Sequence, residues 1–337
     1  MSPSPLPLST KPHSEPRELV QLLKKRGMII SDEARAVRKL SQIGYYRLSG
    51  FWYPCRRPKR DENGRYLKDE KTNLPIRDSL FQEDVSFEEI LGLYLFDKRL
   101  RQLILDAVER IEIYMRTLIA HEVGRIDPLA YEREEFINPK VLKTKRKGGV
   151  VVNHWYNWTT RLNELINTSK EDSIKWHRDR NRPIPFWALI ECWDFGLMSK
   201  YFENLNGRCQ NQICKQIGIQ YPGTLKNWLI EINVLRNRCA HHSRIWNREE
   251  ANPISLKGLE KDEYFNQLSL TDDARKRIFG RICVMWYLVK KIGPSSNWIT
   301  RVANIIDQKP KIPCCPLTAM GLPHNDRFPR QLFGIEY

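Results

Sequence analysis

The feature that most constrains the fold is an apolar stripe that continues for some thirty residues in the first half of the chain. Apolar side chains return there at steps of three and four residues between positions 93 and 118. The stripe consists of Leu93, Phe96, Leu100, Ile104, Ala107, Ile111, Met115 and Leu118. This period matches one face of an α-helix, so the sequence predicts a single long amphipathic helix.

Other segments also show helical periodicity. Residues 17–43 predict two short helices, because Gly27 would end the first, and Ser31 with Asp32 would cap the second. Further helical patterns cover residues 186–205, 224–235, 274–292 and 297–307. Alternation typical of a β-strand is scarce outside residues 150–155. We therefore expect a predominantly all-α fold without internal repeats.

The composition of successive segments predicts how the chain is organised. Pro and Ser dominate the first residues, whereas turn-rich, basic stretches interrupt the helical patterns after residue 54 and after residue 142. We expect a flexible tail at 1–16, an N-terminal helical and loop region at 17–84, a helical domain at 85–310 with a basic insertion near 126–185, and a C-terminal tail at 311–337.

The formal net charge of +16 favours an anionic partner, either nucleic acid or an acidic membrane surface. The chain has no run of eighteen apolar residues, so we expect no membrane-spanning segment. Its N-terminus lacks a basic region followed by an apolar core, which is the pattern of a secretory signal. We therefore expect a cytoplasmic protein.

The eight cysteines are spread along the chain without a repeating framework. Without an export signal, we expect reduced thiols. Cys209 and Cys214, together with Cys314 and Cys315, offer four possible zinc ligands. Because a second spaced pair is missing, we expect neither a metal site nor a cofactor.

The densest cluster of functional side chains lies in LRNRCAHHSRIWNRE, residues 235–249. It contains four arginines and two adjacent histidines, namely Arg236, Arg238, Arg244, Arg248, His241 and His242. Mutual repulsion makes such a cluster costly unless an anion lies against it. An RNA phosphate is the anion that we expect.

An apolar stripe over 225–239 runs into this cluster, and a continuing helix would place Arg236 near the middle of that stripe. Such a guanidinium needs a paired anion or an opening to solvent. We favour a helix break after Leu235, with Asn237 capping a new helix. Arg236 and His241 would lie about 140° apart on one helix, which suits a groove shared by two copies across a two-fold axis. Arg238 and His242 would share a face of that groove.

These residue types fit a metal-independent ribonuclease. Histidine can remove the proton of a ribose 2′-OH or protonate the leaving 5′-oxygen. Arginine can hold the phosphate in a bidentate fork and stabilise the charge that develops on it. Because the attack uses the 2′-OH, the expected substrate is RNA.

The segment RNRCAHHSRIWNR resembles the signature of Abi-like abortive-infection proteins of the AbiD/AbiF type, bacterial phage-defence proteins of the HEPN ribonuclease superfamily. Residues 22–54 and 185–205 also look like that family, as does the helix with Glu109, Arg110, Glu112 and Arg116. The resemblance covers most of residues 17–305. It implies an all-α HEPN helical bundle with an N-terminal helical and aromatic extension and basic loop insertions, frequently dimeric and with metal-independent endoribonuclease activity.

The resemblance also assigns roles. Arg236 and His241 inherit the catalytic roles and Asn237 a supporting one, with Arg238 and His242 beside them. The motif of that superfamily is an arginine, four intervening residues and a histidine, and a second match to it, from Arg116 to His121, makes the assignment ambiguous. We expect His121 to be a core histidine, and Glu112 with Arg116 to form an i,i+4 ion pair that helps to hold Arg236.

Other residues are candidates for contacts to RNA. Aromatic residues fill positions 45–53, where Tyr46 and Arg47 could stack on unpaired bases, although packing is the commoner role of such rings. Basic clusters on expected loops could contact the RNA backbone. These further candidates are Arg56, Arg57, Lys143, Lys145, Arg146, Lys147 and Arg244. The charge excess also suggests a bound structured non-coding RNA that inhibits or directs the nuclease.

Two alternatives remain open at this point. A non-catalytic RNA-binding protein could use a HEPN scaffold to hold a structured RNA. A DNA-binding regulator is weaker, because the sequence shows no helix-turn-helix or zinc-finger spacing.

Overall fold

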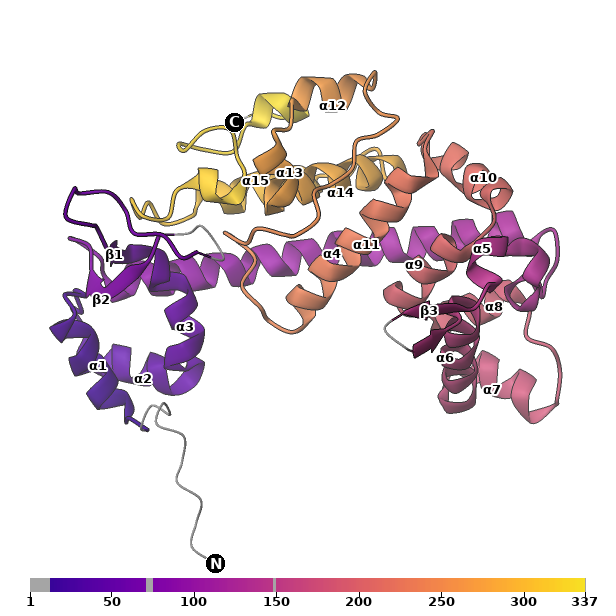
Figure 1. Cartoon of the computed structure of the whole chain (residues 1–337), viewed down its shortest axis with the longest axis horizontal. Coiled ribbons are helices and arrows are strands. Elements are labelled where there is room, and N and C mark those ends of the chain that lie inside the picture. Colours follow the sequence, from indigo (N-terminus) through magenta and orange to yellow (C-terminus); the bar gives the residue numbers. More distant parts are fainter. Residues whose placement is uncertain (1–12, 71–74, 148–149, 337) are drawn as a thin grey trace, which may run out of the picture. The chain divides into compact units, whose positions relative to one another are not determined.

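The computed structural model describes residues 13–70, 75–147 and 150–336, and within them the fold is predominantly α-helical, as expected (Figure 1). The flexible tail expected at 1–16 lies outside the described residues up to residue 12. The chain divides into two compact units, residues 1–98 with 308–316 and residues 99–307 with 317–337. The boundary between these two units falls within the predicted long helix.

The first unit consists of short helices and one strand pair. Its elements are α1 (Pro16–Lys25), α2 (Glu33–Ile43), α3 (Tyr45–Trp52), the 3-10 turn η1 (Tyr53–Cys55), β1 (Arg56–Pro58) and β2 (Arg77–Phe81). The predicted helix ends are confirmed: Asp32 accepts a hydrogen bond from the Arg35 N–H at 2.8 Å, and Gly27 has φ +89° after α1. The strands β1 and β2 pair antiparallel within the turn-rich stretch.

A disulfide closes the first unit. Cys55, buried after α3, is bonded to Cys314, and the Cys315 sulfur lies 3.6 Å from that of Cys55. The expectation of reduced thiols is therefore wrong for this pair. The two partners are 259 residues apart, so their meeting depends on the tertiary fold and leaves no spacing pattern in the sequence. Among the described residues, the sulfurs of Cys55, Cys314 and Cys315 lie close enough together to hold a metal ion only if the disulfide is reduced; Cys209 and Cys214 are not part of that group.

The long helix is confirmed as α4 (Phe87–Gly124) (Figure 1). All eight residues of the apolar stripe are buried. In the second unit, Trp298 of α15 (Trp298–Asp307) donates from its indole to the Leu103 carbonyl at 2.8 Å. Arg110 and Arg301 both pair with Asp106 at 3.1 Å, so polar contacts also join α4 to α15.

The core of the second unit is helical. α14 (Ile278–Ile292) is buried all round from Ile278 to Val289, which is typical of a central helix. The unit also contains α8 (Phe186–Leu189), η4 (Ile190–Cys192), α9 (Phe195–Asn204), α10 (Gly207–Ile217), α11 (Pro222–Ala240), α12 (Glu263–Leu268) and α13 (Asp272–Lys276). α11 packs against α9, α10 and α14.

The basic insertion expected near 126–185 is more regular than a loop. It holds η2 (Ala130–Glu132), η3 (Glu134–Phe136), α5 (Pro139–Leu142), β3 (Lys145–Lys147), β4 (Val150–Val152), α6 (His154–Thr168) and α7 (Asp172–Asp179). β3 and β4 pair antiparallel, and α6 buries Trp155, Trp158 and Leu162. Only one face of α6 is apolar, and the polar residues around it weaken the helical pattern in the sequence.

The C-terminal tail expected at 311–337 is also wrong. The segment forms η5 (Leu317–Met320) and η6 (Arg330–Phe333) and buries Met320, Phe328 and Phe333. The prolines suggested a tail, but the large apolar residues between them pack into the fold. Arg330 is held there by Asp307, whose carboxylate lies 2.8 Å away.

Candidate functional site

The centre of the candidate site is the C-terminal part of α11, which is one continuous helix (Figure 1). The break expected after Leu235 is wrong, because the buried stripe continues through Leu235 to Cys239 and keeps the helix packed. Arg236 is accommodated without a break since its side chain is only half-buried and opens into a polar cavity. The same expectation placed Asn237 as an N-cap; it lies within the helix instead, exposed, and its Oδ1 accepts from Arg236 at 3.2 Å.

The two histidines form the end of α11. His241 is the C-cap residue, and its N–H donates to the Asn237 carbonyl at 2.9 Å. His242 follows in the left-handed region at φ +58°, the position that glycine usually takes in this type of helix end. The Ser243 N–H donates to the Arg238 carbonyl at 2.8 Å, which completes the Schellman pattern. Both imidazoles are exposed as a result.

Arg238 takes a structural position. Its guanidinium pairs with the Glu250 carboxylate at 2.6 Å, and both side chains are largely buried. Burial lowers the pKa of Arg238, and the charge of Glu250 opposes that shift. The helical face that Arg238 and His242 were expected to share does not exist, because α11 ends at Ala240. Arg238 therefore anchors the chain that follows α11.

The cavity that Arg236 lines has a volume of 330 Å³. It is formed by α4, the segment between α6 and α7, and the connection from η4 to α9. Its charged lining residues are Arg116, Lys170, Arg236, Glu112, Glu171, Glu191 and Asp194. Four carboxylates thus face three cations. His241 does not line this cavity, so within one chain Arg236 and His241 have different surroundings.

Glu112 and Arg116 form the expected i,i+4 ion pair, and both side chains are largely buried. Burial raises the pKa of Glu112, against the charges of Arg116 and Arg236, which lower it. Arg116 also donates to the carbonyls of Trp193 and, at 3.2 Å, of Glu191. Arg116 therefore links α4 to the connection before α9 through hydrogen bonds, and its ion pair keeps Glu112 beside Arg236.

The two residues of the second motif match, Arg116 and His121, line different cavities. His121 is exposed, so the expectation of a core histidine is wrong; the residue lies beyond the edge of the buried stripe. It lines a different cavity of 380 Å³, together with Arg125 and the half-exposed Trp187, and Arg116 is not part of that lining.

The remaining RNA-binding candidates are dispersed. Tyr46 and Arg47 are exposed on α3, and Arg57 donates its Nε–H to the Phe81 carbonyl at 2.8 Å. Lys143 is exposed and Arg244 is half-buried. The side chains of three further candidates lie outside the described residues: Lys145, Arg146 and Lys147.

The sequence did not indicate four of the charged residues that surround Arg236. Lys170, Glu171 and Asp194 come from connecting segments and Glu191 from η4, and they meet Arg236 only in the folded chain. Asp194 carries one local signal, since it precedes a helix and its Oδ1 accepts from the Leu197 N–H at 2.6 Å.

Comparison of the chain with known proteins identifies the family to which it is similar. The model of the family described as Abi-like protein matches residues 38–247, more than half of the chain. This range includes α4, α9 and α11 with Arg236 and His241. No curated protein and no solved structure matches the chain. Within the described residues, none of the helices combines the length and apolar composition that crossing a bilayer requires.

Proposed function

The chain belongs to the Abi-like protein family, and on that premise we propose that it is a metal-independent endoribonuclease of abortive-infection phage defence. The observation that carries the proposal is the end of α11, where a half-buried arginine in a polar cavity is followed five residues later by an exposed histidine. Arg236 has a neutral neighbour, Asn237, and a clamp of buried polar groups behind it.

The chemistry assigns a role to each group. A ribose 2′-OH attacks the adjacent phosphate and the 5′-oxygen leaves, so one proton must be removed and another supplied. The exposed imidazole of His241 can accept the first proton or donate the second. Arg236 holds the phosphate oxygens and stabilises the charge that they gain in the transition state.

The phosphate belongs at the rim of the Arg236 cavity, not in its interior. Four carboxylates against three cations make the interior unfavourable for an anion. We therefore assign Glu112 and Arg116 to the positioning of Arg236. Since His241 lies outside this cavity, we propose that a second copy of the chain completes the site across a two-fold axis.

The net charge of +16 favours a second candidate function, a non-catalytic protein that holds a structured RNA. A stably bound non-coding RNA is compatible with either function, and in the nuclease it would inhibit or direct cleavage.

Cleavage of a mixed RNA pool in excess EDTA tests the proposal. Wild type should cleave and leave 2′,3′-cyclic phosphate ends. His241→Ala should lower the rate by about 10²- to 10⁴-fold and Arg236→Ala by about 10²- to 10³-fold. His121→Ala is the matched control, an exposed histidine on another helix in the alternative motif, and it should retain the wild-type rate.

Two results contradict the nuclease assignment. One is equal cleavage by wild type and His241→Ala, and the other is cleavage by wild type that EDTA abolishes. If wild type does not cleave but RNA co-purifies with it, the non-catalytic function is favoured. If mixing inactive Arg236→Ala and His241→Ala proteins restores part of the activity, the composite site is supported.

A further inference from the structure

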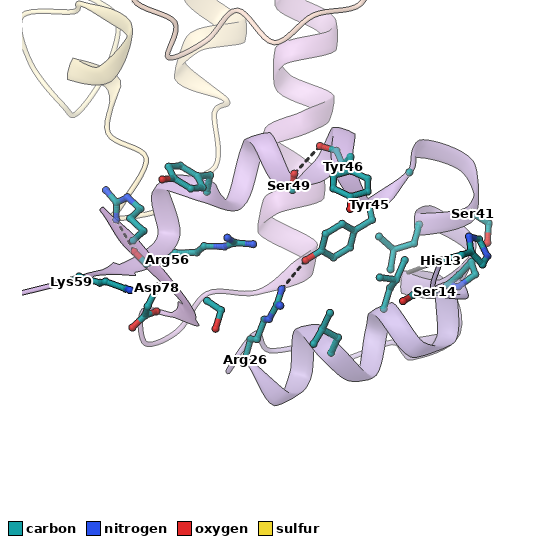
Figure 2. A pocket seen from close by; sticks show the side chains of 18 residues that line it. His13, Ser14, Arg26, Ser41, Tyr45, Tyr46, Ser49, Arg56, Lys59 and Asp78 are labelled. Atoms are coloured by element: carbon teal, nitrogen blue, oxygen red, sulfur yellow. Dashed lines mark hydrogen bonds between the residues drawn. The ribbon is translucent and has the colours of Figure 1, made fainter. Parts of the chain in front are cut away.

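A cavity of 1210 Å³ lies in the first unit, bordered by α1, α2, α3 and the β1–β2 pair (Figure 2). None of its lining residues belongs to the Arg236 cavity. Its volume exceeds the range of about 300–1,000 Å³ that is usual for small-molecule pockets. The size favours a segment of a polymer over a single metabolite.

The cavity is cationic. The basic side chains that line it are Arg26, Arg56, Lys59 and Arg77. Asp78 is the one acidic residue among the described residues of the lining, and its Oδ1 already accepts from the Leu80 N–H at 2.7 Å. Such a balance attracts an anionic ligand.

Tyrosines provide the second feature of the cavity. Figure 2 shows Tyr45 reaching toward Arg26, whose guanidinium donates to its hydroxyl at 2.9 Å. The Tyr45 ring also packs edge-on against Trp52 and Tyr46, at centroid distances of 5.1 and 5.6 Å. Tyr45 is thus a fixed support, whereas the Tyr46 ring that rests on it is 71% exposed.

Tyr53 extends this aromatic surface. It is 48% exposed and follows Tyr46 by seven residues along α3 and η1, so both rings lie on nearly the same face, two turns apart. Exposed rings on a fixed support can stack on unpaired bases of any sequence. Two stacking positions beside cations match a strand with alternating bases and phosphates.

Arg56 gives an independent indication of a missing ligand. Its Nε is buried without a hydrogen-bond partner among the described residues, and its guanidinium lies 5.8 Å from the Tyr53 ring centroid. A buried donor without a partner destabilises the free protein, which is tolerated where a ligand supplies the acceptor. Arg77, by contrast, donates to the Arg56 carbonyl at 2.6 Å and so supports the strand pair.

We propose that this cavity binds an unpaired RNA strand, with bases stacked on Tyr46 and Tyr53 and a phosphate held by Arg56. A duplex fits poorly, because its base faces are already stacked inside the helix. An acidic peptide or an anionic lipid surface would use the cations but has no general need of the exposed tyrosines. That the strand is RNA and not DNA rests on the proposed function; the stacking and phosphate contacts do not.

Binding of a fluorescent 2′-O-methyl oligouridylate to the full-length protein tests the proposal. This probe lacks the 2′-OH needed for cleavage, so the measurement is independent of the nuclease. Tyr46→Ala should raise Kd by about 5- to 100-fold, and Tyr46→Trp should restore binding. Tyr156→Ala is the matched control: Tyr156 is 66% exposed on α6 in the second unit, and its removal should leave Kd unchanged.

Arg56→Gln separates a ligand-binding role from a structural one. It should weaken the salt dependence of binding, lowering the slope of log K against log salt by about 0.7, while Arg35→Gln, on the exposed side of α2, should not change it. Because the Nε of Arg56 has no hydrogen-bond partner among the residues that the structure describes, Tm should be unchanged or higher. A lower Tm for Arg56→Gln would show that this arginine supports the fold.

Competition identifies the ligand class. Unlabelled oligouridylate should displace the probe, and duplex RNA of equal length should displace it poorly. If polyglutamate or phosphatidylserine vesicles compete as well as the single strand, and Tyr46→Ala binds like wild type, the cavity recognises charge alone and the proposal is wrong. Failure of RNA cleavage with intact, Tyr46-dependent binding would contradict the proposed nuclease and leave this site standing.

Discussion

The position of α11, and with it of Arg236, depends on a buried ion pair between Glu231 and Arg281. Both side chains are at most 3% exposed. Arg281 of α14 donates to the Glu231 carboxylate and also to the carbonyls of Asn252 at 3.0 Å and Arg275 at 3.1 Å. Removing either charge leaves the other buried without compensation.

Arg281→Met should therefore destabilise the protein strongly. Loss of one partner of a buried pair costs about 3–5 kcal/mol, which corresponds to a drop of roughly 10 °C in Tm for a unit of about 200 residues. Glu231→Leu should cost a similar amount, because it leaves the guanidinium buried without its anion. Urea unfolding followed by circular dichroism measures both changes.

The double variant Glu231→Leu with Arg281→Met provides the decisive comparison. It removes both buried charges, so most of the loss should be recovered. The Arg275 carbonyl keeps its bond from the Ile254 N–H at 2.9 Å, whereas the Asn252 carbonyl loses the guanidinium. A residual cost of about 1–3 kcal/mol is expected for that acceptor. Additive losses in the double variant, or a single variant as stable as wild type, would refute the reasoning.

Three further outcomes are expected. His242→Gly should raise the free energy of unfolding by about 0.5–1 kcal/mol, because glycine adopts the left-handed position without strain; His242→Ala should show no gain in the same urea titration. Cys314→Ser should leave the disulfide count unchanged, because the Cys315 sulfur is 3.6 Å from that of Cys55 and can replace its neighbour; thiol titration with and without the further change Cys315→Ser checks this. Burial raises the pKa of Glu112, so its contribution to stability is present at low pH and is lost as pH rises through that pKa; the stability of wild type relative to Glu112→Gln should therefore fall as pH rises from about 4 to 7, by thermal unfolding across pH.

The sequence predicted the parts of the fold that depend on local periodicity. The stripe from Leu93 to Leu118 predicted α4, because apolar residues at steps of three and four over this length match only one face of an α-helix. Helix ends with a capping side chain, such as Asp32, were predictable for the same reason. α6 was missed although Trp155, Trp158 and Leu162 follow helical spacing, because the surrounding polar residues weakened the pattern.

The parts that depend on tertiary contacts could not be predicted. The sequence predicts a helix end at Leu235, because an arginine on a buried face needs a paired anion or an opening to solvent. The cavity beside Arg236 and the carboxylate of Glu112 remove that conflict, and neither is visible in the local sequence. The partner of Cys55 could not be predicted either, because Cys314 is 259 residues away and meets it only in the folded chain.

In the candidate site, the residues proposed to position Arg236 differ from those proposed to contact the RNA. Arg116 and Glu112 satisfied the motif spacing or the charge pattern as well as Arg236 did, but their hydrogen bonds are directed into the protein. Arg236 combines the same polar support with an opening to solvent, and His241 is freed from the helix by its end at Ala240. A side chain whose bonding capacity is used by the fold can position a phosphate-binding group, whereas the group itself must keep donors for the phosphate. By that criterion the proposed reaction is assigned to Arg236 and His241, and Glu112 and Arg116 on α4 are expected to affect its rate only through Arg236.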